Sequence, residues 1–424
     1  MTELGTRRSR GRVAADRILT SQYLEIFRLP GTRKFSAACF IGRMPMAMIN
    51  LGVILVVSAA TGSYAIAGAV SAVGSLGYAF AAPQLGRITD RVGQRRLLGP
   101  LTAAFAASAA AFATCAELRA PLWVLFVTGA LFVTTMPSFG SLVRSRWSAL
   151  LGDSPLLHTA FSFESVADEL IFVTGPALVT LLATQLLPVA GIAVAAMLAV
   201  LGTVLLVGQQ ATEPAAAPGR HTSGSAIKVP GMTVIMAVFA GLGAMFGTID
   251  LSTVAFATEQ HHKSLSGFIL GTYALGSATG GLWYGARTWR APLYRRFLIT
   301  LAGMVAGVAP LWAIPNVPVL FGVIFFCGLS ISPTIIGGYA LIERKMPAGL
   351  LTEGMSLLST AIGLGLAAGP PLAGRLIDAH NAHWGYMFAL ACGSVALAAG
   401  LIGARRLSAG PERHPPAAVT SGHG

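Results

Sequence analysis

Twelve long apolar runs constrain the fold of this chain more than any other feature of its sequence. A helix needs about 20 mostly apolar residues to cross the hydrocarbon core of a bilayer. Runs of this kind lie near 36–58, 64–85, 97–116, 121–143, 160–184, 187–208, 231–257, 264–285, 296–314, 317–340, 353–374 and 384–404. Only helices and closed barrels span lipid, and the sequence lacks the short alternating segments of a barrel. It therefore predicts an all-α membrane protein with twelve transmembrane helices.

The composition agrees with a protein surrounded by lipid. Hydrophobic residues make up 54% of the 424 residues and charged residues only 11%, whereas soluble domains carry about 25% charged residues. The first apolar run is too long for a secretory signal, so we expect it to remain as a helix. The four cysteines, Cys39, Cys115, Cys327 and Cys392, fall inside apolar runs without metal-ligand spacing, which favours buried free thiols.

A polar stretch at 209–230, rich in Pro, Ala, Ser and Gly, divides the apolar runs into two sets of six. This composition is typical of a flexible linker. We therefore expect an N-terminal tail at 1–34, a six-helix bundle at 35–208, the linker at 209–230, a second six-helix bundle at 231–404 and a C-terminal tail at 405–424.

The positions of lysine and arginine predict the orientation in the membrane. If the N-terminus is cytoplasmic, 25 of the 29 basic residues fall on the cytoplasmic side; the exceptions are Arg43 within the first helix and Arg119, Lys263 and Arg375 outside. Cytoplasmic loops carry the excess of basic residues in membrane proteins. We therefore expect both termini in the cytoplasm, and we attribute the net charge of +13 to orientation and anionic lipid rather than to nucleic acid.

The two halves repeat each other at a nearly constant offset. Gly68, Leu76, Gly77 and Gly86 recur 199 residues later as Gly267, Leu275, Gly276 and Gly285. Further matches join Ile49-Asn50-Leu51 to Ile249-Asp250-Leu251, Pro137 to Pro333, and Ser165, Gly175 and Pro176 to Ser359, Gly369 and Pro370. Two six-helix halves related by an axis along the membrane normal are a known transporter architecture, with substrate bound between the halves near the midplane.

The loop GRITDRVGQRR at 86–96 carries a family resemblance. Its residues Gly86, Asp90, Arg91, Gly93, Arg95 and Arg96 match motif A of the major facilitator superfamily, between the second and third helices as in that family. The chain therefore resembles transporters of this superfamily over nearly its whole length, and the expected fold is theirs: two pseudo-twofold-related six-helix bundles. The equivalent loop at 285–296 keeps a glycine and a basic end but has no aspartate.

The resemblance implies that this loop acts as a gate on the cytoplasmic side. In the family, the aspartate at the position of Asp90 contacts the positive N-terminal end of the eleventh helix, which begins here near Glu353, and favours the outward-facing state. Such a contact is worth about 0.3–1 kcal/mol, and Gly86 and Gly93 permit the tight turn. The alternative is a plain basic loop that only sets the topology.

Two glycine–proline pairs resemble the antiporter motif of drug:proton exporters. Gly175-Pro176 lies in the fifth helix and Gly369-Pro370 in the eleventh, and the second copy is the closer match. The pairs favour an exporter and a role in gating. The alternative is a packing kink, because glycine and proline let a helix bend and approach its neighbour.

Five ionisable residues lie within apolar runs, where a charge costs about 2.5–3.5 kcal/mol and usually serves a function. Those that lie inside a run rather than at its end are Arg43, Glu164, Asp168, Glu169 and Asp250. Since Arg43 and Asp168 should lie at similar depth, we predict that Arg43 pairs with Asp168 or Glu169. Three acids then face one base, and burial disfavours the charged form of an unpaired carboxyl, which suits proton coupling. The alternative is a structural ion pair, with Glu164 at the membrane interface.

Asp250 is the repeat mate of Asn50. Their helices, the first and the seventh, line the central cavity in the resembled fold, so the two side chains should face each other. We expect them to bind polar groups of the substrate, or Asp250 to carry a proton. The alternative is a hydrogen bond that only joins two helices.

Together these features predict a secondary transporter that works by alternating access, and they favour proton-coupled export of a small organic molecule. Uptake of a sugar or metabolite on the same fold is the alternative, and a non-transporting membrane enzyme or sensor is a third reading. The chain has no nucleotide-binding motif and no histidine in a helix core, so we expect no enzyme activity, cofactor or metal. We expect a monomer in the cell membrane, with substrate, protons and lipid as its partners.

Overall fold

The computed structural model describes residues 24–152, 154, 156–215, 226–285, 287, 289–346 and 351–408. Most of the two predicted tails and the middle of the predicted linker lie outside these residues. Within them the chain is helical and forms no strand. The helices of the first half are α2 (Thr32–Thr61), α3 (Tyr64–Val92), α4 (Gln94–Glu117), α5 (Leu122–Thr134), α6 (Phe139–Leu151), α7 (Leu156–Gln185) and α8 (Ala190–Val207). Those of the second half are α9 (Met232–Glu259), α10 (Ser266–Gly285), α11 (Leu293–Val308), α12 (Val317–Gly328), α13 (Ile331–Lys345), α14 (Leu351–Ala379), α15 (Ala382–Ile402) and the short α16 (Ala404–Ser408).

Eleven helical segments of the described chain are long and apolar enough to cross a membrane. They correspond to eleven of the twelve apolar runs. The remaining run is α10, whose six glycines and several hydroxyl side chains lower its hydropathy. α10 packs on α7 and on α12. It therefore lies in the bundle as the eighth transmembrane helix, as the sequence repeat predicts.

The fourth and tenth runs are broken helices, where the sequence predicted continuous ones. α5 stops at Thr134 and α6 resumes at Phe139, while α12 stops at Gly328 and α13 begins at Ile331. Pro137 and Pro333 lie at or just after these breaks, and proline cannot donate the backbone hydrogen bond that continues a helix. A side-chain hydrogen bond lies beside each break: Tyr78 Oη to Ser138 Oγ and Ser277 Oγ to Ser332 Oγ, both 2.7 Å.

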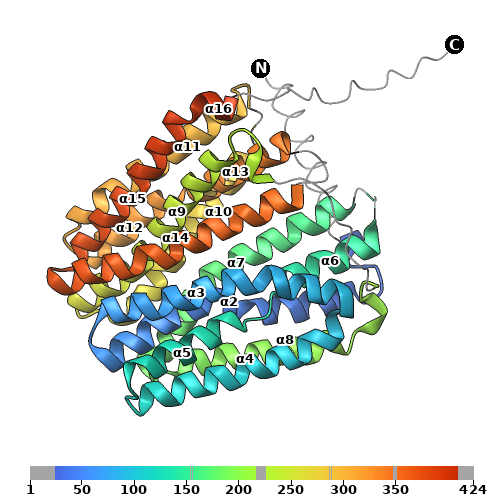
Figure 1. The fold of residues 1–424 in the computed structure, drawn as a ribbon, viewed down its shortest axis with the longest axis horizontal. Coiled ribbons are helices and arrows are strands. Elements are labelled where there is room, and N and C mark those ends of the chain that lie inside the picture. The colour runs from blue at the N-terminus through green and yellow to red at the C-terminus, as the bar shows by residue number, and fades with distance from the viewer. Residues whose placement is uncertain are drawn as a thin grey trace, which may run out of the picture.

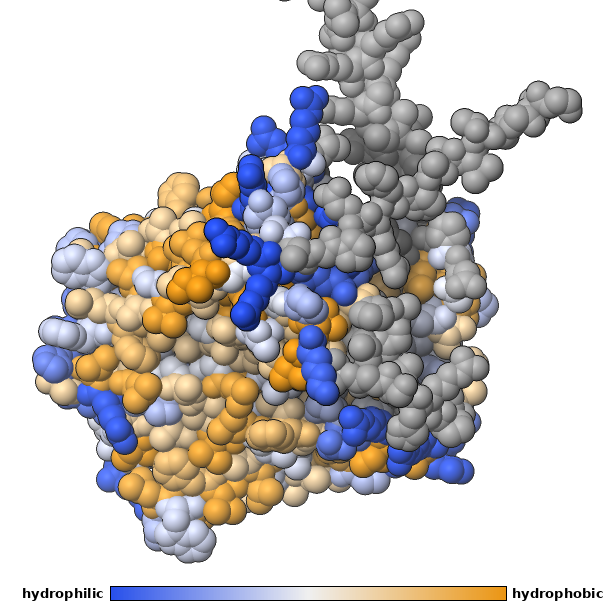
Figure 2. Space-filling view, turned by 45° about the horizontal axis from the view of Figure 1, so that its top comes forward, coloured by the Kyte–Doolittle hydropathy of each residue, from blue (hydrophilic) through white to orange (hydrophobic). Residues whose placement is uncertain are grey.

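The helices lie side by side, with those of the first half grouped apart from most of those of the second (Figure 1). α2 packs on α7 and α8, and α9 packs on α14 and α15 in the equivalent way. The two halves meet chiefly where α3 packs on α14 and α7 packs on α10. Apolar side chains cover most of the flank seen in Figure 2, and hydrophilic ones gather toward its ends, as expected for a flank in lipid.

The two ends of the bundle carry different connections between helices. The start of α2 lies against the α8–α9 connection, since Gly31 packs on Thr212. The end of α13 lies at the same end of the bundle, where Lys345 Nζ donates to the carbonyl of Arg406 beside Gly231. We call this end, where the described chain begins and ends, the terminal face. The other end, which carries the α2–α3 and α9–α10 connections, is the opposite face.

Short 3-10 helices form the two described ends of the predicted linker, at Gln210–Thr212 and Ala226–Lys228. The first is held by the buried Arg146, which donates to the carbonyl of Gln209 and to Thr212 Oγ1 at 2.8 and 2.7 Å. The start of the linker is therefore fixed to the first half, which the composition did not predict.

Candidate functional site

A cluster of four charged side chains lies inside the first half. Arg43 of α2 contacts Glu164 through Nη2 and Asp168 through Nη1, the latter at 2.8 Å. Arg144 of α6 contacts the other carboxylate oxygen of Asp168 at 2.7 Å. The structure thus brings Arg43 to Asp168, one of the two partners expected. Two acids balance two bases in this cluster.

Glu164 is buried, whereas one reading of the sequence placed it at the membrane interface. Its carboxylate accepts hydrogen bonds from Ser36 Oγ at 2.8 Å and from Trp147 Nε1 at 2.9 Å, in addition to the Arg43 contact. Burial of an ion pair is stabilising only when such extra hydrogen bonds satisfy the charges. Glu164 therefore has the surroundings of a structural ion-pair partner.

Arg144 is the member of the cluster that the sequence reading missed. It lies just after the fourth apolar run at 121–143, outside the segments in which an embedded charge was expected. Its side chain is 38% exposed and that of Asp168 is 20% exposed, whereas Arg43 and Glu164 are closed off from solvent. The Asp168–Arg144 end of the cluster is therefore the part that solvent reaches.

Glu169 faces away from this cluster, since successive residues of a helix are rotated by about 100°. Its carboxylate accepts a hydrogen bond from Ser332 Oγ of α13 at 3.2 Å, and Ser332 is bonded in turn to Ser277 of α10. No basic side chain lies within ion-pair distance of Glu169 among the residues that the structure describes. Glu169 is thus a carboxyl of the first half whose hydrogen bond, in the described part of the chain, comes from a hydroxyl of the second.

Asn50 and Asp250, the repeat mates, meet between the halves. Asn50 Nδ2 of α2 donates to Asp250 Oδ2 of α9 at 3.3 Å, and Ser71 of α3 donates to Asn50 Oδ1. Asp250, too, forms no ion pair with any described residue. Two carboxyls without a basic partner therefore lie at the junction of the two halves.

The prolines of the two glycine–proline pairs lie where one half packs closely on the other. Gly68 of α3 packs on the carbonyl of Pro370 in α14, and Gly267 of α10 packs on the carbonyl of Pro176 in α7. A Cβ at either glycine would clash with the facing backbone. Both contacts lie toward the opposite face, where Gly374 also packs on the backbone of Ala65. Residues that match in the sequence repeat thus make equivalent contacts.

Asp378, near the end of α14, caps the start of α3 on the opposite face. Its carboxylate accepts from Ser63 Oγ at 2.6 Å and from the backbone N–H groups of Tyr64 and Ala65 at 2.9 Å each. An anion is favoured at this position because the N-terminus of a helix carries a partial positive charge. This contact joins the two halves, and no motif in the sequence indicated it.

Residues 86–96, predicted to form a loop, lie on the terminal face as the last residues of α3 and the first of α4, with Gly93 alone between the two helices. Gly86 lies within α3, so the turn expected there is at Gly93 only. Gly93 ends α3 with φ of 93°, a conformation that favours glycine. The N–H of Arg95 donates to Glu213 Oε1 of the linker at 2.9 Å, and Arg91, Arg95 and Arg96 are exposed. The side chains of Asp90 and Glu353 lie outside the described part of the structure, so their expected contact stays a prediction.

The remaining reactive side chains form no further centre. The four cysteines are free; Cys39 and Cys327 are buried, and Cys115 and Cys392 partly so. Across the described ranges, no group of histidine, cysteine and acidic side chains could hold a metal ion.

Comparison with known proteins identifies the family to which the sequence and the fold are similar. The family model of the Major Facilitator Superfamily matches residues 35–286 and 233–422. No curated protein sequence matches the chain. The solved structure of the nucleoside transporter NupG is 13% identical, with a TM-score of 0.67 over 90% of this chain and 100% of its own.

Two further solved structures, each 14% identical, share the fold. An auto-inhibited POT family peptide transporter has a TM-score of 0.67 over 91% of this chain and 99% of its own. A bacterial homologue of the iron transporter ferroportin, in an inward-facing state, has a TM-score of 0.65 over 87% of this chain and 98% of its own. Similarity at this level of identity concerns the fold alone.

Proposed function

Because the chain belongs to the major facilitator superfamily, we propose that it exports a small organic molecule in exchange for protons, by alternating access. The family and the fold identify a multi-pass membrane transporter rather than an enzyme. The direction of transport, the coupling ion and the roles of individual residues are our proposal.

One observation supports proton coupling above the others. Glu169 and Asp250 are carboxyls without a basic partner in the described chain, and each is hydrogen-bonded across the junction of the halves. A hydrogen bond to a charged carboxylate is about twice as strong as a neutral one. Protonation therefore weakens a contact between the halves, and loss of the proton strengthens it. Proton occupancy is in this way linked to the relative positions of the halves, as an antiporter requires.

The Arg43 cluster suits a positioning role in this mechanism. Arg43 fixes α7 to α2 through Glu164 and Asp168, and Glu169 is the next residue of the same helix. With the charges of Glu164 and Asp168 both balanced by arginine, Glu169 is the carboxyl of α7 that remains available for a proton. Glu169 is therefore the carboxyl of α7 that we propose to carry the proton.

The contacts on the opposite face support an inward-facing arrangement. If the termini are cytoplasmic, as the basic residues predict, the opposite face is external. Asp378 and the packing of Gly68 and Gly267 then close the external ends of the halves. Transport requires these contacts to break, so that the halves can separate externally and close at the cytoplasmic side.

The test is transport in inverted membrane vesicles with an imposed pH gradient, using a substrate found by screening the wild-type protein. We expect Glu169→Gln and Asp250→Asn to abolish proton-driven accumulation, while Glu117→Gln, an exposed carboxyl at the end of α4, retains it. If both junction variants keep proton-driven flux, the coupling assignment is wrong. Proton-driven accumulation in right-side-out vesicles alone would indicate uptake instead of export.

A further inference from the structure

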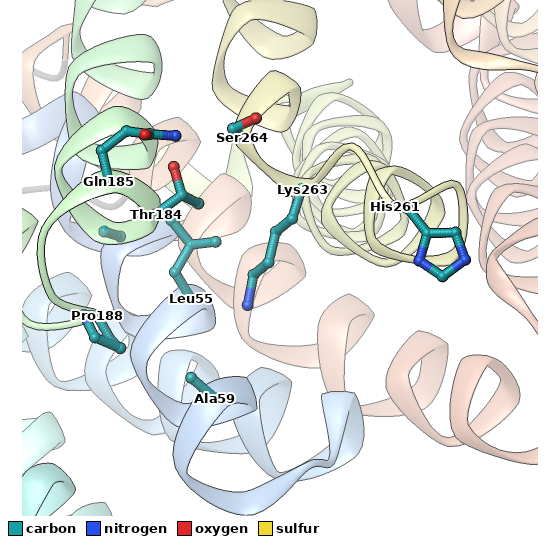
Figure 3. Close-up of a pocket in the computed structure, with 9 residues that line it drawn as sticks. Leu55, Ala59, Thr184, Gln185, Pro188, His261, Lys263 and Ser264 are labelled. Atoms are coloured by element: carbon teal, nitrogen blue, oxygen red, sulfur yellow. The ribbon is translucent and has the colours of Figure 1, made fainter.

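A pocket of about 360 Å³ opens on the opposite face between the two halves (Figure 3). Leu55 and Ala59 of α2 and Thr184 and Gln185 at the end of α7 line it from the first half. Lys263 and Ser264, in the connection between α9 and α10, line it from the second half. Its volume falls at the lower end of the range of small-molecule sites, about 300–1,000 Å³.

The ammonium group of Lys263 reaches into this pocket toward α2 (Figure 3). Its side chain makes no hydrogen bond or ion pair with any residue that the structure describes. Burial lowers the pKa of Lys263, and no carboxylate opposes that effect. The cation is therefore partly removed from water without the anion that would normally accompany it.

The other walls indicate what kind of anion fits. Gln185 and Ser264 offer an amide and a hydroxyl as hydrogen-bond donors, and no aspartate or glutamate lines the pocket. Leu55 and Ala59 make one wall apolar. A cation, neutral donors from both halves and an apolar wall match a carboxylate that carries a small hydrophobic body.

We propose that this external pocket binds a free organic monoanion, a carboxylate with a small apolar body, between Lys263 and the end of α7. Such a ligand touches both halves, since Gln185 belongs to the first and Lys263 to the second. A ligand that binds one arrangement better shifts the population toward it. On the alternating-access mechanism proposed above, the bound anion stabilises the arrangement that is closed on this face.

Binding is tested on the purified full-length protein, without a proton gradient, so the result does not depend on the transport proposal. Benzoate is the probe, and benzamide, of nearly the same shape but neutral, is its control. We expect benzoate to raise the melting temperature in a saturable way and benzamide to leave it unchanged. Lys263→Met should weaken the benzoate response at least tenfold, while Arg119→Gln, an exposed base on the same face, should keep it. An equal response to benzamide, or an unchanged response in Lys263→Met, would overturn the proposal.

A second measurement locates the ligand. In a variant without the four native cysteines, Ala59→Cys should react with a membrane-impermeant maleimide, and benzoate should slow that reaction. Reaction at an unchanged rate would place the ligand elsewhere and refute the site. If phosphatidylglycerol nanodiscs abolish the benzoate response and phosphatidylcholine nanodiscs do not, the occupant is a lipid phosphate and the free anion is excluded.

Discussion

Replacing Asp378 should release the opposite face. Its carboxylate accepts three hydrogen bonds at the start of α3, at 2.6, 2.9 and 2.9 Å, and these join α14 of one half to α3 of the other. All three are lost when the halves separate on this face. The energy of the contact therefore contributes in full to the equilibrium between the closed and separated arrangements.

The size of the effect follows from the charge and from the cap. A negative charge at a helix N-terminus is worth about 0.3–1 kcal/mol when exposed, and Asp378 is exposed. Asp378→Asn keeps an acceptor oxygen but loses the charge, so about 1 kcal/mol is lost, or about fivefold in the equilibrium. Asp378→Ala also loses the acceptor of these hydrogen bonds, worth about 1 kcal/mol more, for a total of about 30-fold.

The assay measures the distance between spin labels on the opposite face of the two halves. Leu118→Cys, just after α4, and Trp312→Cys, in the 3-10 helix Ala309–Ala313 that follows α11, provide exposed positions in a background without native cysteines. The population with the longer distance should rise in the order wild type, Asp378→Asn, Asp378→Ala. Arg375→Gln, an exposed change one turn earlier in α14, should have no such effect. Equal distance distributions in wild type and Asp378→Ala would show that the contact does not hold this face closed.

Three further predictions test other contacts. Arg43→Met should lower the free energy of unfolding in detergent by about 3–5 kcal/mol, because Glu164 becomes a buried charge without a cation. The double variant Arg43→Met with Glu164→Gln should regain part of that loss. Identical stability of the single and double variants would contradict this explanation. Gly267→Ala should impair transport and lower the melting temperature, because its Cβ would clash with the Pro176 carbonyl, and normal flux in reconstituted vesicles would disprove the close approach. Arg146→Met should speed proteolysis between α8 and α9, because the start of the linker loses its hydrogen bonds; an unchanged cleavage rate would show that other contacts hold it.

The positions of the helices could be predicted from the sequence because lipid imposes a strict requirement on each run. The order of helices, the division at the linker and the internal repeat all follow from apolar length and matching glycines and prolines. α10 shows where hydropathy alone is weakest, since its glycines serve close packing against α7 and α12 at the expense of apolar surface. The repeat assigned it correctly, because its glycines match those of α3.

The environment of each charge was harder to predict because it depends on side chains from several helices. The position of Glu164 near the start of its apolar run is consistent with a membrane interface. In the structure, however, Ser36 and Trp147 from two other helices donate hydrogen bonds to it. Arg144 gives no such signal either, because it lies just after its apolar run and only the fold brings it to Asp168. Asp378 has no signal in its own helix, since its partners are the first residues of α3, and one sequence does not show how two distant helices are rotated against each other.

The reciprocal form of the glycine–proline contacts bears on how this molecule could have arisen. Gly68 of the first half packs on Pro370 of the second, and Gly267 of the second packs on Pro176 of the first. An arrangement in which each partner offers the same pair of surfaces to the other is the isologous interface of a twofold-symmetric dimer. Two copies of one six-helix ancestor could form it without any new contact, and fusion of a duplicated gene would preserve it. After fusion, each half could vary only as far as its counterpart still fitted.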